Sequence, residues 1–189
     1  MRITITGPRS VGKSTIGKFL GKKLKIKYFE SDKLMHNKLK KYGGLDKTIK
    51  SRKIYLIFKN SIPLIKKVLS EKKFVFDLAG GAISTEKNKE LTRKIIKLIK
   101  KESLIIGLLP SKNDLESIKF LFKREIKRKH FKETDKKELR KEVKKDFLKV
   151  KSKIKKHTNI IIYTKDKTPS QIINVIIKQL KKISWEPAS

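Results

Sequence analysis

Near its N-terminus the chain reads Gly7-Pro8-Arg9-Ser10-Val11-Gly12-Lys13-Ser14, which has the spacing G-x-x-x-x-G-K-[ST] of a phosphate-binding loop. The two glycines let the backbone curl so that N–H groups point at phosphate oxygens, where a Cβ would obstruct. Lys13 supplies charge to the outer phosphates, and the Ser14 hydroxyl suits a magnesium ion. Thr15 is expected to start the next helix, whose positive end faces the same anion. We therefore predict a nucleotide-binding segment made of Gly7, Pro8, Arg9, Ser10, Val11, Gly12, Lys13, Ser14 and Thr15.

The segments on either side of this loop strengthen the prediction. Residues 2–6 alternate as a short strand does, and residues 16–20 favour a helix. Strand, loop and helix is the arrangement that this motif needs. The alternative, a chance match in a lysine-rich chain, is disfavoured by that context.

Length and composition narrow the class of protein. A chain of 189 residues is one domain long, and the absence of cysteine excludes disulfides, thiolate metal sites and cysteine nucleophiles. The three histidines are scattered, which disfavours a zinc site. There is no apolar run of membrane-spanning length and no signal-peptide pattern, so we expect a cytoplasmic protein without membrane contact. We also expect a monomer.

The charge is extreme, with 52 Lys and Arg against 18 Asp and Glu, a formal net charge of +34. A charge of this size suits a nucleic-acid binder. However, the lysines are spread along every predicted helix and aromatic residues are only 7%. A genome-wide bias toward lysine would give a metabolic enzyme the same charge. The charge can therefore reflect either solvated lysine faces or a surface that binds polyanions.

Acidic residues follow two of the predicted strands. Residues 26–29 form the second strand and lead to Glu30 and Asp32, which we expect to project differently, one toward a nucleotide-bound metal and the other toward a neighbouring pocket. Asp32 could orient or deprotonate an attacking hydroxyl, or it could only cap a helix beginning at Lys33. Residues 74–77 form the third strand and end in Asp77, a candidate to hold magnesium beside Ser14 and Glu30.

Two glycines, Gly80 and Gly81, come directly after the third strand and permit close approach of the backbone to a ligand, or only a tight turn. Residues 33–70 have helical spacing, with a break at Gly43-Gly44 and a new start at residues 61–63, and are expected to form a helical cap over the pocket. Arg52 and Lys59 in this cap could bind an anionic substrate, although any single lysine is more often a surface residue.

The second half of the chain continues the alternation of strands and helices. Residues 104–110 form the fourth strand, and a long helix from about residue 114 leads to a predicted lid at about 124–137. Its Arg124 and Arg128 suit phosphate oxygens, or are simply solvated helix residues. A further helix starts at Thr134 and Asp135, residues 159–164 form the fifth strand, and residues 168–171 carry a capping box. From Trp185 we expect a tail.

The order of these features resembles that of shikimate kinases. The resemblance rests on the phosphate-binding loop, on Glu30-Ser31-Asp32 where that family has Asp-x-Asp, and on the glycine-rich segment and helix of residues 80–91. The resemblance extends from Met1 to about Leu180, but only the phosphate-binding loop matches the family's motif residue by residue. It implies the P-loop α/β fold of shikimate and nucleoside-monophosphate kinases, with three α/β/α layers and a five-stranded parallel sheet in the order 2-3-1-4-5. It also implies a lid that brings arginine onto the transferring phosphates.

The residues expected to bind the phosphoryl acceptor differ from the pattern of that family. Its Phe-Arg-x-x-Glu motif, which grips the substrate carboxylate, would fall near residues 58–62, where Lys59 replaces the arginine and the glutamate is lost. A lysine does not reproduce a bidentate clamp. A third glycine is missing, because Ala79 precedes Gly80, and the family's substrate-binding arginine near residues 149–156 has only lysines as counterparts. Residues 32–36 also resemble a segment of dephospho-coenzyme A kinases.

We therefore expect an ATP- and Mg²⁺-dependent kinase that moves the γ-phosphoryl group to a hydroxyl or phosphate of a small-molecule acceptor. The expected catalytic residues are Lys13, Asp32, Arg124 and Arg128, the substrate-binding residues Asp32, Arg52, Lys59, Gly80 and Gly81, and the metal-binding residues Ser14, Glu30 and Asp77. Two alternatives remain: a kinase or NTPase acting on nucleic acid, and a regulatory module that binds nucleotide without turnover.

Overall fold

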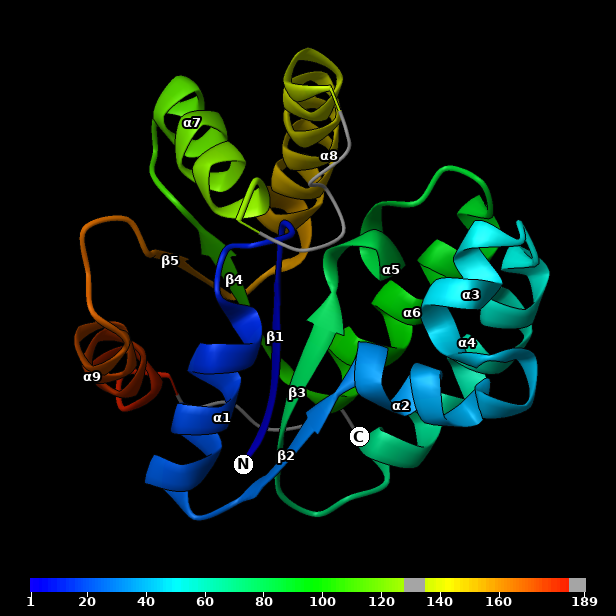
Figure 1. Cartoon of the computed structure of the whole chain (residues 1–189). Coiled ribbons are helices and arrows are strands. Elements are labelled where there is room, and N and C mark those ends of the chain that lie inside the picture. The colour runs from blue at the N-terminus through cyan, green and yellow to red at the C-terminus, as the bar shows by residue number, and fades with distance from the viewer. Residues whose placement is uncertain (128–134, 184–189) are drawn as a thin grey trace.

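Five parallel strands form one sheet in the order β2-β3-β1-β4-β5, which confirms the predicted class and strand order. The computed structural model describes residues 1–127 and 135–183 (Figure 1). The central strands are almost wholly buried because helices cover both faces of the sheet. The strands are β1 (Arg2–Gly7), β2 (Lys27–Glu30), β3 (Phe74–Ala79), β4 (Leu104–Leu109) and β5 (Ile160–Tyr163).

Helices lie in front of and behind the sheet in Figure 1. On one side α1 (Lys13–Leu24) packs on β1, β2 and β3 and against α9 (Pro169–Leu180). On the other side α6 (Lys89–Glu102) packs on β4, and α8 (Lys136–His157) packs on β1 and β4. Helix α7 (Asp114–Glu125) packs against α8, and the end of α7 and the middle of α8 reach the segment that follows β1, through Glu125 and Asp146.

The predicted cap contains three helices beside the main body. They are α2 (Ser31–Lys38), α3 (Gly44–Lys50) and α4 (Ile54–Leu69), with the 3-10 turn η1 (Lys40–Tyr42) between the first two. They share a small core of Met35, Leu39 and Leu56, separate from the main core around the sheet. The short helix α5 (Gly80–Ser84) follows β3 and contacts α6 and α8.

Three predicted helix starts were wrong. Helix α4 runs through Pro63 instead of restarting at residues 61–63, since tertiary packing buries residues on both sides of the proline, with Leu56 in the small cap core and Ile65 and Val68 in the main core. The side chains of Asn60 and Ser61 also donate hydrogen bonds to carbonyls one turn earlier, each at 2.7 Å. Helix α1 begins at Lys13 rather than Thr15, and α2 begins at Ser31, so Asp32 lies in its first turn and is not its cap.

Other local predictions are confirmed. The cap breaks at Gly43 and Gly44, which have φ of +83° and +85°. The capping box at Thr168 and Gln171 is present at the start of α9. In residues 1–127 and 135–183, no helix combines the length and the apolar character needed to cross a bilayer. Half of the predicted lid, residues 128–134, and the tail from Trp185 lie outside the described residues.

Candidate active site

The phosphate-binding loop connects the carboxyl end of β1 to the first turn of α1. Gly12 has φ of +106° and precedes Lys13 as the helix N-cap, so the loop turns its backbone into the positive end of α1. A Cβ on Gly7 would lie 2.7 Å from the Leu108 carbonyl oxygen, so packing against β4 requires this glycine. The Lys13 ammonium donates a hydrogen bond to the Pro8 carbonyl at 3.2 Å, which places it over the loop.

The three predicted metal-binding side chains come together beside this loop. Glu30 and Asp77 are paired in the register of β2 and β3, so both carboxylates project from the same face of the sheet. The Ser14 hydroxyl lies 2.7 Å from Asp77 Oδ2 and 3.4 Å from Glu30 Oε1. The described residues contain no cluster of three or more metal-binding Asp, Glu or His side chains. One hydroxyl and two carboxylates fit Mg²⁺, which takes most of its remaining ligands from phosphates and water.

Burial raises the pKa of the Asp77 carboxyl, and the nearby Asp32 and Glu30 carboxylates raise it further. Lys13 and the hydrogen bond from Ser14 act in the opposite direction without cancelling the effect of burial. A desolvated carboxylate next to two other acids is costly by itself and is stabilised when a cation binds. The electrostatics of Asp77 therefore fit a magnesium-binding role.

Tyr28 belongs to this cluster, although the sequence did not reveal it. Its hydroxyl lies 3.4 Å from both Glu30 Oε2 and Asp77 Oδ2. Burial and the two carboxylates raise the pKa of the Tyr28 phenol, so the phenol remains a donor. A Cβ on Gly17 would lie 2.5 Å from the tyrosine ring, so this glycine lets the ring approach α1 closely. The only available signal was the two-residue spacing between Tyr28 and Glu30, which puts both on one face of β2.

Asp32 occupies a different position from Glu30, as predicted. It lies in the first turn of α2, where Ser31 fixes the helix start by accepting a hydrogen bond from the Ala79 backbone N–H at 3.0 Å. Asp32 and Ser31 line both a cavity of about 790 Å³ at the phosphate-binding loop and a second cavity of about 410 Å³ under the cap helices. Asp32 is the one ionisable residue that the described linings of these cavities share.

Arg124 reaches the loop from the end of α7. Its guanidinium nitrogens lie 3.8 and 3.9 Å from the position that a Cβ on Gly12 would occupy, and its guanidinium carbon lies 5.3 Å from the centre of the Phe120 ring. It also lines the larger cavity. Arg124 is therefore placed to contact phosphates held by the loop. Arg128, the other predicted lid arginine, lies outside the described residues.

Two buried or half-buried acids, both missed in the sequence, hold the middle of the loop. Glu125, which is 2% exposed, accepts a hydrogen bond from the Ser10 hydroxyl and pairs with the Arg9 guanidinium at 2.8 Å. Asp146 on α8 accepts a hydrogen bond from the Arg9 backbone. Burial raises the pKa of the Asp146 carboxyl, and the charge of Arg9 opposes this. Ser10 has φ of +60°, an unfavourable conformation for a residue other than glycine, which these contacts help to hold.

The predicted substrate-binding residues separate into two groups. Gly81 lines both cavities, and nothing lies within 4 Å of the position of a Cβ there. Gly80 lines the larger cavity, but a Cβ on it would lie 2.5 Å from the Gly7 carbonyl oxygen, so it is needed for packing against the loop. Arg52 and Lys59 are exposed and line neither cavity, so the structure does not bring them to Asp32.

Comparison with known proteins agrees with this geometry. The family model for shikimate kinase matches residues 9–181. The solved structure of shikimate kinase from Bacteroides thetaiotaomicron is similar, with a TM-score of 0.76 and 15% identity over 96% of this chain and 98% of that one. Shikimate kinase from Acinetobacter baumannii in complex with shikimate gives 0.74 and 15% over 97% and 94%.

A nucleoside kinase shares the same fold. Deoxyadenosine kinase from M. mycoides has a TM-score of 0.61 and 20% identity, over 97% of this chain and 100% of that one. No curated protein sequence matches the chain. The family model covers most of the chain. The chain therefore belongs to the shikimate kinase family and is an ATP-dependent kinase of the P-loop class.

Proposed function

We propose that this kinase transfers the γ-phosphoryl group of ATP, with Mg²⁺, to a hydroxyl group of a small organic acceptor bound under the cap helices. The observation that carries this proposal is the position of Asp32 at the junction of the two cavities. The larger cavity has the size of a ligand site and contains the phosphate-binding loop, Ser14 and Asp77. An acceptor in the smaller cavity would present its hydroxyl to Asp32.

The chain's own side chains have separate roles in this reaction. Asp32 orients the acceptor hydroxyl and takes its proton as the new O–P bond forms and the bond between the γ-phosphorus and the departing ADP breaks. Lys13 and Arg124 stabilise the charge on the moving phosphoryl group. Ser14, Asp77 and Glu30 hold Mg²⁺, which neutralises phosphate charge when it is bound. Catalysis then comes mainly from positioning and charge stabilisation.

An acceptor screen tests the proposed function. ATP consumption and product mass would be measured with shikimate, nucleosides, nucleoside monophosphates, dephospho-coenzyme A and RNA carrying a 5′-hydroxyl. We expect one organic acceptor to gain a phosphoryl group, and Asp32→Ala to lower that rate by about 10³-fold while ATP still binds. Full activity of Asp32→Ala would remove Asp32 from the mechanism. ATP binding without transfer to any acceptor would favour a regulatory nucleotide-binding module.

One observation favours a second candidate function, nucleic-acid binding. A groove of about 940 Å³ between α6 and α8 is rich in cationic residues. They are Lys89, Arg93, Lys97, Lys100, Lys149, Lys153 and Lys156. Burial lowers the pKa of His157 in the groove, and the charges of Lys100, Lys156 and Lys153 lower it further, as a strongly positive potential would. Such a groove suits a phosphate backbone.

Salt-dependent binding separates this candidate from a surface that is only lysine-rich. Fluorescence anisotropy with labelled single-stranded RNA would be measured at several salt concentrations. If the groove binds RNA, replacing Lys97, Lys100 and Lys153 by Ala makes the negative slope of log K against log salt shallower by about 2. The control replaces Lys137, Lys141 and Lys144, exposed elsewhere on α8, and leaves the slope nearly unchanged. Equal effects of both triples would show that charge alone matters, and no binding near physiological salt would exclude this function.

A further inference from the structure

The second cavity, of about 410 Å³, has a mostly apolar lining where the cap helices face the end of β3. It joins the nucleotide cavity through shared residues that include Ser31, Asp32 and Gly81. Its apolar side chains are Met35, Leu45, Ile49, Ile54, Ile57, Phe58, Leu64, Ile65, Leu78, Leu91 and Ile95, with Ala79 and Ala82. A molecule whose hydroxyl reaches Asp32 would therefore place its body against aliphatic and aromatic surface.

Charged side chains are scarce in this cavity. Among its described lining residues, Asp32 is the one acid and Lys87, an exposed residue, is the one base. The Ser61 hydroxyl lines the cavity but donates a hydrogen bond to the Ile57 carbonyl of its own helix at 2.7 Å. Arg52 and Lys59 are exposed and line neither cavity. The described lining thus contains no guanidinium group that could pair with the carboxylate of a bound molecule.

These features select the class of acceptor. An anionic group in such a cavity would lose its hydration with only the exposed Lys87 as a cation in the described lining, and it would meet the carboxylate of Asp32, so its binding is disfavoured. An apolar ring would gain from burial against the same walls. We propose that the phosphoryl acceptor of this kinase is an uncharged molecule with an aromatic or alicyclic body and a hydroxyl group that reaches Asp32. The inference rests on the proposed function, because that function assigns the acceptor to this cavity.

Matched pairs of acceptors, alike except for one carboxylate, test the inference. Shikimate is compared with its methyl ester, and 4-(hydroxymethyl)benzoate with its methyl ester, because each ester keeps the hydroxyls and the ring. For the full-length protein we expect each neutral ester to bind at least about 10-fold more tightly than its acid in the presence of an ATP analogue. Where turnover occurs, kcat/KM should favour the ester by a similar factor. Equal or tighter binding of the acids, or no binding of either ester up to millimolar concentration, would overturn the inference.

Variants that add a cation to the cavity give an independent test. Ile54 lines the cavity at the start of α4 and is part of neither buried hydrophobic cluster, so Ile54→Arg should fold and shift the preference toward the acids by about 10-fold. Tyr55→Arg is the matched control, because Tyr55 is 64% exposed and outside the cavity, and it should leave the preference unchanged. If Ile54→Arg does not fold, Ile49→Arg replaces it, since Ile49 lines the same cavity and is 48% exposed. An unchanged preference in a folded cavity variant would contradict the inference.

Failure of the inference can be told apart from failure of the proposed function. ATP binding and its loss in Lys13→Ala are measured alongside the acceptor pairs. Tight binding of an ester without phosphoryl transfer would refute the proposed transfer but would still support a cavity that prefers uncharged molecules. Transfer to shikimate in preference to its ester would support the proposed function and refute the inference about the acceptor.

Discussion

Asp77 is 3% exposed at the active site, and its carboxyl is held in an environment that favours the protonated form. An acid whose pKa is raised by folding destabilises the ligand-free protein at pH values above its folded pKa, and this penalty disappears below its unfolded pKa. The Ser14 hydroxyl can still donate to an asparagine oxygen at this position. The charged carboxylate of Asp77 therefore favours magnesium binding but destabilises the ligand-free fold.

We expect Asp77→Asn to raise the free energy of unfolding of the ligand-free protein at pH 7, and to lower phosphoryl transfer by at least about 10²-fold. Urea unfolding of both proteins between pH 7 and pH 3.5 checks this. The advantage of the variant should shrink as the pH falls, because the wild-type carboxyl then becomes neutral too. A variant that is less stable than wild type at pH 7 would contradict this description of Asp77.

The two glycines after β3 give a second prediction at the scale of single residues. A methyl group on Gly80 would meet the Gly7 carbonyl oxygen at 2.5 Å, so Gly80→Ala should destabilise the fold by about 1–3 kcal/mol. Gly81→Ala should change stability by less than about 1 kcal/mol, because nothing lies within 4 Å of its Cβ position. Thermal and urea unfolding measure both. Comparable losses in the two variants would contradict the assigned contacts.

At the scale of elements, the end of α7 is tied to the phosphate-binding loop. Glu125 contacts Ser10 and Arg9, and the adjacent Arg124 lies over Gly12. The last turn of α7 therefore helps to fix the loop conformation, including the unfavourable φ of Ser10. The predicted lid at about 124–137 would begin at this junction.

Removing the contacts of Glu125 with Arg9 and Ser10 should weaken ATP binding. We expect Glu125→Ala to raise the KM for ATP about 10-fold and to destabilise the protein by about 1–3 kcal/mol, because Arg9 and Ser10 lose their acceptor. Glu125→Gln, which keeps an oxygen acceptor, should recover part of both losses. Glu90→Ala is the control, since Glu90 is an exposed acid on α6 that pairs with Lys94 of the same helix. Steady-state kinetics and urea unfolding report the effects, and an unchanged KM in Glu125→Ala would refute the positioning role.

Much of the fold at this scale could be predicted from the sequence. Continuous apolar runs identified β3, β4 and β5, and the G-x-x-x-x-G-K-S motif identified the turn between β1 and α1. The strand order came from the family resemblance, not from any local pattern. The passage of α4 through Pro63 could not be predicted, because it depends on tertiary packing that buries Leu56 in the cap and Ile65 and Val68 in the main core.

The candidate site residues that could be predicted are those that lie close in sequence to a recognisable motif or element. Ser14, Glu30, Asp77 and Arg124 lie at the ends of recognisable elements. Glu125 could not be identified, because its partners Arg9 and Ser10 are more than a hundred positions away and an acid beside lysines suggests only a surface pair. Arg52 and Lys59 were selected for their charge, and the orientation of the cap helices leaves them exposed.

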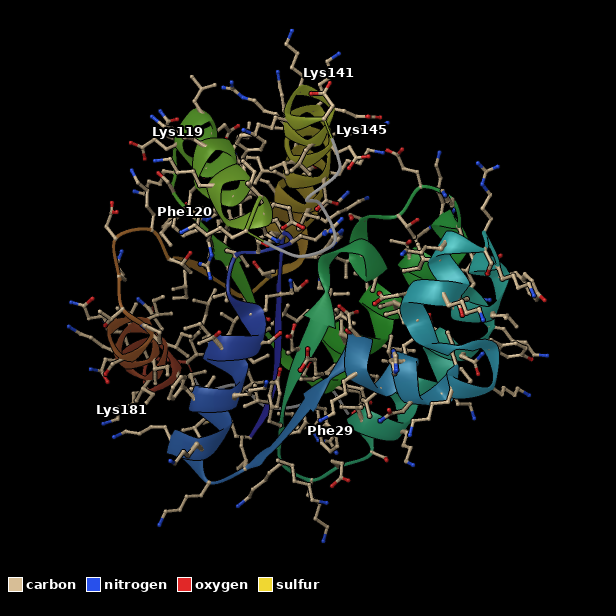
Figure 2. All side chains as sticks on the ribbon, in the orientation of Figure 1. Phe29, Lys119, Phe120, Lys141, Lys145 and Lys181 are labelled. Carbon is tan, nitrogen blue, oxygen red and sulfur yellow. The ribbon has the colours of Figure 1, made fainter. Side chains whose placement is uncertain are left out.

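At the scale of the whole molecule, the net charge of +34 must oppose folding by self-repulsion. Figure 2 shows Lys119 on α7 and Lys141 on α8 pointing away from the body of the protein. Outward cations repel each other through water, and salt screens this repulsion, with a Debye length of about 10 Å at 0.1 M.

We expect the thermal midpoint of unfolding to rise by several degrees as sodium chloride increases from about 0.02 M to about 0.3 M, because screening removes repulsion in the folded state. Differential scanning calorimetry measures this shift. An uncharged osmolyte at matched osmolality is the control for general effects of solute. A midpoint that falls with salt would show that attractive ion pairs, such as Arg2 with Glu102, outweigh the repulsion.

We propose that the γ-phosphoryl group of ATP, bound at the phosphate-binding loop, is transferred to an organic hydroxyl at Asp32. Following ³²P from γ-labelled ATP into acceptor and into inorganic phosphate, in the wild type and in two lysine variants, tests this transfer. We expect label in an organic product, at least about a 10²-fold loss of transfer in Lys13→Ala, and wild-type transfer in Lys18→Ala, whose lysine is exposed on the same helix. Label found only in inorganic phosphate, or full transfer by Lys13→Ala, would contradict it.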